Sequence, residues 1–216
     1  FNAALWCEAG AVVRSFRKSL LPTYDVFDEA RYFAPSGGSG VMEYRGITFG
    51  VTICEDLWND KDYWPHRLYP VDPVEAASAA GARLLVNLSA SPFSLRKQAL
   101  RQDMLGAIAK KRGLPLAYCN QVGGNDELVF DGRSALYAPD GSLLARAAGF
   151  EEAVLVVDAL ARSTTAAPGS GDDLSAPAET WRALVLGTRD YLRTCGFQKA
   201  LLGLSGGIDS AVVAAV

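Results

Sequence analysis

The stretch GVTICEDLW, residues 50–58, decides the fold, because an apolar run ends there in a thiol and two carboxylates. Residues 47–54 are β-rich, and a short continuous apolar run is typical of a strand that is buried on both faces. Cys54 is therefore predicted at the end of a buried strand, followed directly by Glu55 and Asp56.

A β-helix-β unit is predicted after this strand. Residues 83–88 and 114–119 form two further apolar runs that indicate buried strands. Between them Ser94 can cap a helix, and Gly113 suits its C-terminal end. The apolar residues expected on the buried side of this helix are Leu95, Ala99, Leu105, Ile108 and Ala109. Strands that alternate with covering helices predict an α/β domain.

Turn signals predict two hairpins. Residues 2–16 hold two β-rich runs around a short Gly-containing turn, and Lys18 falls just past the second run. Residues 134–145 hold two short runs around a Pro-Asp-Gly turn at 139–141, and 153–157 predicts one more strand.

The composition changes after the last of these strands. Residues 162–177 are rich in Ser, Thr, Ala, Gly, Asp and Pro and have no apolar periodicity, which predicts an interdomain linker. Apolar residues then recur at helical spacing over 181–195, Gly196 ends that helix, and 199–204 predicts a strand.

Composition and charge limit the class of protein. At 216 residues and 50% hydrophobic content, the chain can form one large domain or two small ones with a substantial core. A formal net charge of -3 with scattered Lys and Arg argues against a nucleic-acid partner.

The cysteines and the apolar runs point to a soluble, cytoplasmic protein. The four cysteines are far apart and form no CxxC pair, so they predict neither a zinc site nor a redox dithiol. No apolar run approaches the roughly 20 residues that cross a bilayer. The sequence starts with Phe1 and stops inside an apolar run, so we expect further segments at both ends.

LSGGIDS, residues 204–210, follows an apolar run and precedes a helix-like one. Its two glycines allow a tight turn that brings backbone N–H groups close to an anion, and its two serines add hydroxyl donors at a helix N-terminus. The motif lacks the Lys of the GxxxxGK[ST] loop and the spacing of dinucleotide-binding loops. A phosphate loop is predicted, and a plain Gly-rich turn is the alternative.

This string resembles the PP-loop of the ATP pyrophosphatases, which adenylate a carboxyl or carbonyl group and release pyrophosphate. The resemblance implies that ATP, with Mg²⁺ neutralising its charge, is a cofactor. The residues implied in ATP binding are Gly203, Ser205, Gly206, Gly207, Asp209 and Ser210. The loop alone would also suit synthetases for GMP, argininosuccinate or asparagine.

Cys54 is a candidate nucleophile, because a thiol at a strand end can face a carbonyl carbon while the following N–H groups face its oxygen. A free thiol has a pKa of about 8.5, so a nearby cation or base must activate it. Lys18 is a candidate for that cation, and His66, the one histidine, is an alternative partner. Taken alone, Cys54 would be read as a small buried apolar residue.

RKSLLP at 17–22, the aromatic and charged residues of 24–33 and the Cys54 stretch together resemble the nitrilase superfamily. That family uses a Glu-Lys-Cys triad. The resemblance implies that Cys54 is the nucleophile, Lys18 the lysine, Glu29 a second glutamate that places the lysine, and the backbone of Glu55 an oxyanion donor.

Three longer segments are similar to the glutaminase domain of NAD⁺ synthetases: YDVFDE at 24–29, NLSASPF at 87–93 and NQVGGNDELVFDG at 120–132. This resemblance implies that Tyr24, Ser91 and Lys97 hold glutamine. For Lys97 a solvated charge on a helix surface is the competing interpretation.

The resemblance implies the fold, α/β with a nitrilase-like α-β-β-α sandwich, and a division into parts. Residues 1–160 would form the amidase domain, 161–178 a linker, and 179–216 the first helix, strand and phosphate loop of a Rossmann-like PP-loop domain. The implied reaction releases ammonia from glutamine and uses it to convert deamido-NAD⁺ to NAD⁺. The partners we expect are these small-molecule substrates and further copies of the chain, with no nucleic acid and no membrane.

Two other functions stay open. One is a stand-alone nitrilase-type amidase, and the other is an inactive piece that serves as a scaffold. The family's general-base glutamate is expected upstream of Phe1, because Glu8 lies in a hairpin turn where a solvated charge is the simpler interpretation.

Overall fold

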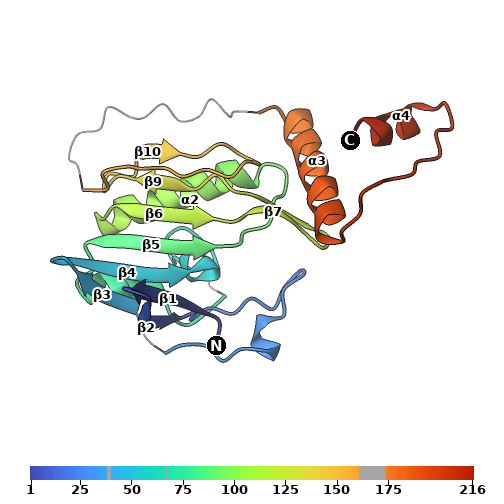
Figure 1. Cartoon of the computed structure of the whole chain (residues 1–216). Helices are drawn as coiled ribbons and strands as arrows, with labels where there is room; N and C mark the ends of the chain where they lie inside the picture. Colours follow the sequence, from blue (N-terminus) through green and yellow to red (C-terminus); the bar gives the residue numbers. More distant parts are fainter. Residues whose placement is uncertain (38–39, 67, 161–173) are drawn as a thin grey trace.

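Three neighbouring parallel strands, β4 (Ile47–Ile53), β5 (Leu84–Ser89) and β6 (Leu116–Asn120), form the centre of a six-stranded sheet (Figure 1). Their order in the sheet is β10-β9-β6-β5-β4-β3. The structure, a computed structural model, describes residues 1–37, 40–66, 68–160 and 174–216. The predicted α/β class and the two further central strands are confirmed.

Two helices cover one face of this sheet and close the core. α1 (Pro73–Ala79) joins β4 to β5, and α2 (Lys97–Arg112) joins β5 to β6. Both pack in a single apolar cluster with the inward side chains of the strands. Its most buried members, each at most 1% exposed, are Leu57, Ala77, Leu85, Met104, Leu105, Ile108, Ala109 and Leu116.

The predicted start of α2 was wrong by two residues, about half a turn. Arg96, with φ 68°, is the N-cap, and the carbonyl rather than the hydroxyl of Ser94 accepts a hydrogen bond there, from Lys97 N–H. Leu95 therefore precedes the helix, and Leu95 and Ala99, which were expected on its buried side, are both exposed. The predicted end is confirmed, since Gly113 is the C-cap with φ 62°, a left-handed conformation that favours glycine.

The edges of the sheet are antiparallel. β3 (Gly40–Tyr44), which the sequence analysis did not predict, pairs with β4. At the other edge β9 (Ala135–Tyr137) pairs with β6 and with β10 (Leu143–Arg146), so the second predicted hairpin is confirmed. The strand predicted at 153–157 does not form. Val154 and Val156 there are 92% and 96% exposed, and within the described residues no strand pairs with this segment.

The predicted N-terminal hairpin is confirmed as β1 (Ala3–Glu8) and β2 (Ala11–Arg17). It lies against β3 and β4, because Trp6 contacts Tyr44 and Phe49 with ring centroids 5.2 and 5.5 Å apart. Lys18 follows directly after β2, and the next two N–H groups, of Ser19 and Leu20, bind Asp56 just beyond the carboxyl end of β4.

The C-terminal part contains two helices, α3 (Ala176–Thr194) and α4 (Ile208–Ala215). α3 packs on another hairpin, formed by β7 (Val122–Asn125) and β8 (Leu128–Asp131) (Figure 1). The linker was predicted over 161–178, and its residues 161–173 lie outside the described residues. Of the remaining five, 176–178 already belong to α3.

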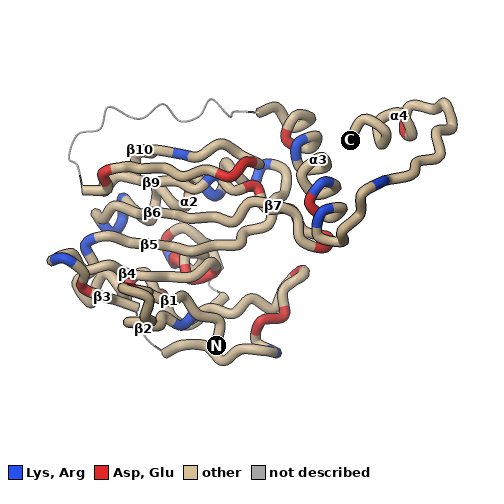
Figure 2. The backbone as a smooth tube through the Cα atoms, viewed as in Figure 1, with Lys and Arg blue, Asp and Glu red and all other residues tan. Residues whose placement is uncertain are grey.

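The segment between α3 and α4 differs from the prediction. Residues 199–204 are extended but form no strand, because no strand of the described chain lies alongside to supply hydrogen bonds. Figure 2 shows Lys and Arg interspersed with Asp and Glu along the described chain. None of the described helices is both long enough and apolar enough to span a membrane.

Candidate active site

Cys54 lies where the apolar strand β4 ends and the short helix η2 (Cys54–Leu57) begins. Its φ of 46° is uncommon for a residue with a side chain, and such conformations gather at functional sites. The Asn87 side-chain amide donates hydrogen bonds to Thr52 Oγ1 at 3.0 Å and to the Cys54 carbonyl at 3.5 Å. The thiol is thus presented on a tightly held turn at the carboxyl end of the central sheet.

A buried ion pair stands beside this turn. Lys18 Nζ lies 2.6 Å from Glu29 Oε1, and the side chains are 1% and 19% exposed. Glu29 begins the short helix η1 (Glu29–Arg31), and its other carboxylate oxygen accepts a hydrogen bond of 3.3 Å from the Asn2 side chain. The lysine is therefore fixed in place from two separate segments of the chain.

Asp56 ties the lysine segment to the cysteine turn. Its Oδ1 accepts the backbone N–H groups of Ser19 at 3.0 Å and Leu20 at 2.9 Å, and its Oδ2 accepts that of Ile53 at 3.0 Å. The side chain is 3% exposed. One carboxylate thus holds the backbone on both sides of the site.

A cavity of about 490 Å³ brings these groups together. Lys18, Glu29 and Cys54 all line it, together with Asn120 and Phe130. A thiol, an ammonium and a carboxylate that share one cavity can attack and polarise a carbonyl group.

Burial sets the ionisation of the thiol. Desolvation raises the pKa of Cys54 above its ordinary value, whereas the Lys18 charge, the Ala90 backbone N–H and the Ser89 hydroxyl lower it. The neutral thiol is therefore favoured at neutral pH, and Lys18 is the main charged group that opposes this.

This balance of charges predicts how the reactivity of the Cys54 thiol depends on pH. We expect the alkylation rate of Cys54 by iodoacetamide to rise with pH and to reach half its maximum above the ordinary thiol value of about 8.5. A Lys18→Met variant should move this midpoint higher, because a charge that lowers the pKa is lost. Peptide mapping separates Cys54 from the exposed cysteines, which are Cys7, Cys119 and Cys195. A midpoint below 8.5, or one that Lys18→Met leaves in place, would contradict this balance of charges.

Glu55 follows the thiol and is held by two tyrosines. The Tyr24 hydroxyl donates to both carboxylate oxygens at 2.9 Å, and the Tyr69 hydroxyl to one of them at 3.4 Å. Burial raises the pKa of this carboxyl. Its backbone N–H lies in the first turn of η2, where N–H groups have no partner inside a helix. Tyr24 itself is 44% exposed.

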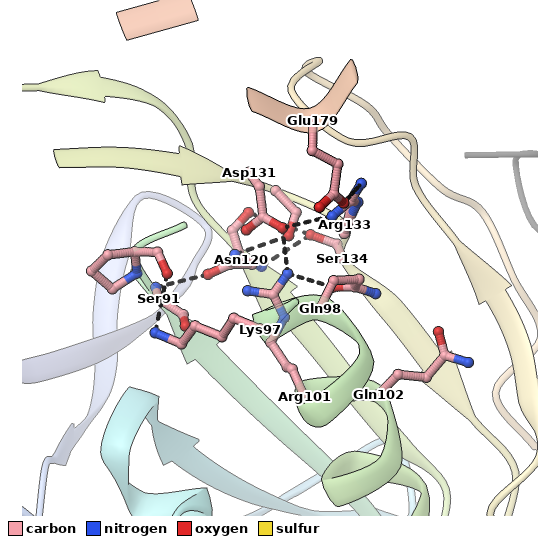
Figure 3. A network of polar contacts seen from close by, with 12 residues as sticks. Ser91, Lys97, Gln98, Arg101, Gln102, Asn120, Asp131, Arg133, Ser134 and Glu179 are labelled. Carbon is pink, nitrogen blue, oxygen red and sulfur yellow. Dashed lines mark hydrogen bonds and ion pairs between the residues drawn. The ribbon is translucent and has the colours of Figure 1, made fainter. Parts of the chain in front are cut away.

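The other predicted glutamine-binding residues are Ser91, on the segment between β5 and α2, and Lys97, the first residue of α2 (Figure 3). Ser91 is buried, and its N–H donates to Asn120 Oδ1 at 2.9 Å. Lys97 Nζ donates to the Pro92 carbonyl at 3.0 Å and lies 5.6 Å from the centre of the Trp58 ring. Burial lowers the pKa of Lys97, which does not fit a fully solvated charge.

The structure does not bring every predicted residue to the cavity. The predicted residues outside the set of described residues that line it are Tyr24, Glu55, Ser91 and Lys97. Tyr24 and Glu55 are hydrogen-bonded to each other beside Cys54. His66 is exposed and is also outside that set.

The predicted phosphate loop lies apart from this cavity, on the surface before α4. Ser205 Oγ and Ser210 Oγ are 3.1 Å apart, and Gly207 N–H donates to Ser205 Oγ at 3.3 Å. Gly206 has φ 88°, a conformation that favours glycine. Gly203 lies in the extended segment before the loop, and Asp209 is in the first turn of α4.

Three buried polar residues of the site were not predicted from the sequence: Asp56, Asn87 and Asn120. Two features of the sequence could have indicated the first two. Asn87 interrupts the apolar run of β5, and Asp56 follows a strand end directly, positions where a polar side chain needs buried partners. Neither signal identifies the distant partners, since Ser19 and Leu20 lie 37 and 36 residues from Asp56, and Thr52 lies 35 residues from Asn87.

Removal of the Asp56 carboxylate should destabilise the fold. In Asp56→Ala three backbone N–H groups lose their acceptor, and each buried unpaired group costs about 1–3 kcal/mol. We expect the free energy of unfolding to fall by about 3 kcal/mol or more. Denaturant unfolding of this variant beside Asp28→Ala, whose side chain is 58% exposed, measures the difference. Equal stability of the two variants would contradict the role of Asp56 as a tie.

Comparisons with known proteins agree with this geometry. The carbon-nitrogen hydrolase family model matches residues 1–168, and the NAD synthase model matches residues 180–216. A glutamine-dependent NAD(+) synthetase from Synechocystis sp. is 47% identical over 100% of this chain and 39% of its own length. The chain spans about two fifths of the length of the curated relatives it matches.

The solved structures that resemble this chain include proteins of the same two kinds, an NAD+ synthetase and an amidase. The structure of a glutamine-dependent NAD+ synthetase from Acinetobacter baumannii in complex with ADP has a TM-score of 0.81 and 34% identity, and covers 100% of this chain and 39% of that one. A mutant amidase from Nesterenkonia sp. AN1 has a TM-score of 0.53 and 29% identity, over 66% of this chain and 48% of that one. That structure shows covalent addition of the acetamide moiety of fluoroacetamide at the active-site cysteine.

Proposed function

This chain belongs to the carbon-nitrogen hydrolase family, and we propose that it carries the glutamine amidase site and the first part of the ATP site of a glutamine-dependent NAD⁺ synthetase. The observation that carries the proposal is Cys54 at a strand end, in one cavity with the buried Lys18–Glu29 ion pair. The phosphate loop in the same chain supports the ATP-using half.

Cys54 would open the glutamine side chain. Its sulfur attacks the carboxamide carbon, the C–S bond forms, and the C–N bond breaks to release ammonia. The thiol proton is transferred to the departing nitrogen. In this family a carboxylate takes the proton from the thiol and passes it on. Water then hydrolyses the thioester, giving glutamate and the free thiol.

Lys18 would stabilise the negative oxygen that develops during both steps. Its ammonium is buried, and Glu29 holds it at 2.6 Å, so little reorganisation is needed at the moment of reaction. The Glu55 backbone N–H is the second donor we assign to this oxygen. We assign recognition of glutamine to Tyr24, Ser91 and Lys97, whose hydroxyl and ammonium groups match the polar head and carboxylate of an amino acid.

The phosphate loop would hold ATP. Backbone N–H groups at Gly206 and Gly207, the hydroxyls of Ser205 and Ser210, and the N-terminus of α4 form a donor set that suits phosphate. Gly203 and Asp209 complete the proposed site. When bound, Mg²⁺ would neutralise phosphate charge; among the described residues no group of three or more His, Cys, Asp or Glu could hold a metal, so we assign it no protein ligand.

The whole reaction would join both halves. ATP adenylates the carboxylate of deamido-NAD⁺ with release of pyrophosphate, and ammonia then displaces AMP to give NAD⁺. We propose an amidase domain over 1–160, a linker over 161–178 and a synthetase part over 179–216. We also propose a cytoplasmic homo-oligomer, and the free thiols support a reducing compartment.

Product assays with two nitrogen sources test the proposal. In the natural protein that carries this sequence, we expect NAD⁺ from deamido-NAD⁺ and ATP with either glutamine or ammonia. Glutamate should appear only with glutamine. Release of ammonia from glutamine with no NAD⁺ under any condition would support a stand-alone amidase instead, and no turnover of glutamine would overturn the proposal.

A further inference from the structure

Helix α3 is fastened at two points, to the β7–β8 hairpin and to Arg133, which lies just after it. Near its C-terminal end, Asp190 Oδ2 accepts the Gly124 N–H at 2.9 Å. Between the two points the backbones approach so closely that a Cβ on Gly124 would lie 3.0 Å from the Gly187 Cα. At its first turn, Glu179 Oε1 lies 2.8 Å from Arg133 Nη2.

Glu179 completes a buried charge network (Figure 3). Arg133 and Arg101 both contact Asp131 Oδ2, at 3.3 and 2.7 Å. The side chains of Arg101, Asp131 and Arg133 are each at most 2% exposed, and that of Glu179 is 12% exposed. Glu179 thus adds a second carboxylate beside two buried cations. Its removal would take away one of the negative charges that compensate them, which is costly in a low-dielectric interior.

Two branches connect this network to the segment between β5 and α2. Arg101 lies one turn beyond Lys97 on α2 and also contacts Gln98 Oε1 at 2.5 Å. On the other branch, the Gly132 carbonyl, between Asp131 and Arg133, accepts the Asn120 amide at 2.9 Å, and Asn120 Oδ1 accepts the Ser91 N–H. The Gly132 carbonyl thus supports Ser91 through Asn120, and the Asp131 side chain holds α2 at Arg101, one turn beyond Lys97.

We propose that Glu179 is a positioning residue for the amidase site: its carboxylate holds the Arg133–Asp131–Arg101 network, which in turn fixes Ser91 and Lys97. The inference rests on the proposed function. Glu179 belongs to neither matched segment, since one ends at residue 168 and the other begins at 180. α3 thereby supports the amidase site from outside the cavity, since none of the described residues that line the cavity belongs to α3.

The test compares Glu179→Gln with Glu127→Gln, which makes the same change at an exposed residue in the turn of the same hairpin. In the natural protein we expect Glu179→Gln to raise the KM for glutamine about tenfold, in the range for residues that act through a contact network. The kcat should change less than about twofold, because the groups that meet the reacting carbonyl are untouched. Ammonia-driven synthesis should stay at the wild-type rate, and the control should match wild type in all three.

Hydrogen–deuterium exchange gives a readout that needs no turnover. Peptides covering 89–98 and 120–134 should exchange faster in Glu179→Gln than in Glu127→Gln. If Glu179→Gln does not fold, the double variant Arg133→Met with Glu179→Met, which removes one charge of each sign, should fold and show the raised KM. Unchanged exchange and KM, or equal losses of glutamine-driven and ammonia-driven synthesis, would overturn the inference while the amidase assignment stands. If the wild type does not turn over glutamine, the amidase assignment itself is wrong.

Discussion

A Cys54→Ala variant should lose glutamine-driven NAD⁺ formation by about 10³-fold or more, because removal of a nucleophile leaves only binding and oxyanion stabilisation. Ammonia-driven formation should continue at the wild-type rate, since ammonia enters after the step that needs the thiol. Coupled measurement of NAD⁺ with each nitrogen source gives both numbers from one preparation.

Cys119 supplies the matched control. It is a second thiol that lines the same cavity, yet it lies on β6 and has no lysine assigned to it. Cys119→Ala should keep glutamine-driven synthesis within a few-fold of wild type. A large loss in Cys119→Ala together with a small one in Cys54→Ala would transfer the nucleophile to β6 and contradict the account.

Replacing Lys18 should have the second largest effect. Lys18→Met removes the one cation assigned to the developing oxyanion, and loss of such a donor costs about 10²–10³ in kcat. Glutamine-driven synthesis should fall by that factor, and ammonia-driven synthesis should be unaffected. Glu29→Gln should lose less, because an amide oxygen can still accept the hydrogen bond from Lys18.

Lys110→Met is the control for Lys18→Met, because Lys110 is an exposed lysine on α2. It should behave as wild type with both nitrogen sources. Thermal unfolding of both variants shows whether the lost activity of Lys18→Met reflects chemistry or unfolding. An equal fall of glutamine-driven and ammonia-driven synthesis in a folded Lys18→Met would contradict the division of labour.

The parts of the fold that local signals determine could be predicted. The apolar runs of β4, β5 and β6 are buried on both faces and are visible in the sequence. The turns before Ala11 and after Pro139 carry glycine where the chain must reverse, and Gly113 ends α2 in the left-handed conformation that a helix end favours.

The errors share a non-local cause. Residues 153–157 and 199–204 have strand-like composition, but a strand needs a neighbour for its N–H and C=O groups, and composition does not say whether one is present. β3 was missed for the converse reason: its five residues include Gly40 and Glu43, and pairing with β4 stabilises it. The contacts of α3 with β7 and β8 are likewise non-local and could not be predicted from the sequence.

In the candidate site, too, local features could be predicted and non-local contacts could not. The strand end at Cys54 follows from the sequence, whereas the roles of Lys18 and Glu29 depended on family resemblance, and only the fold brings these two residues to 2.6 Å. The three N–H groups bound by Asp56 come from two segments, and Glu179 meets Arg133 across a stretch that includes the predicted linker. Sequence spacing carries no information about such contacts.

Mass spectrometry of the protein quenched in acid during glutamine turnover tests the central claim most directly. The account predicts a γ-glutamyl thioester on the peptide that contains Cys54, and none on the peptide that contains Cys119. Glutamine turnover with no acyl group on Cys54, or with the acyl group on another residue, would contradict it.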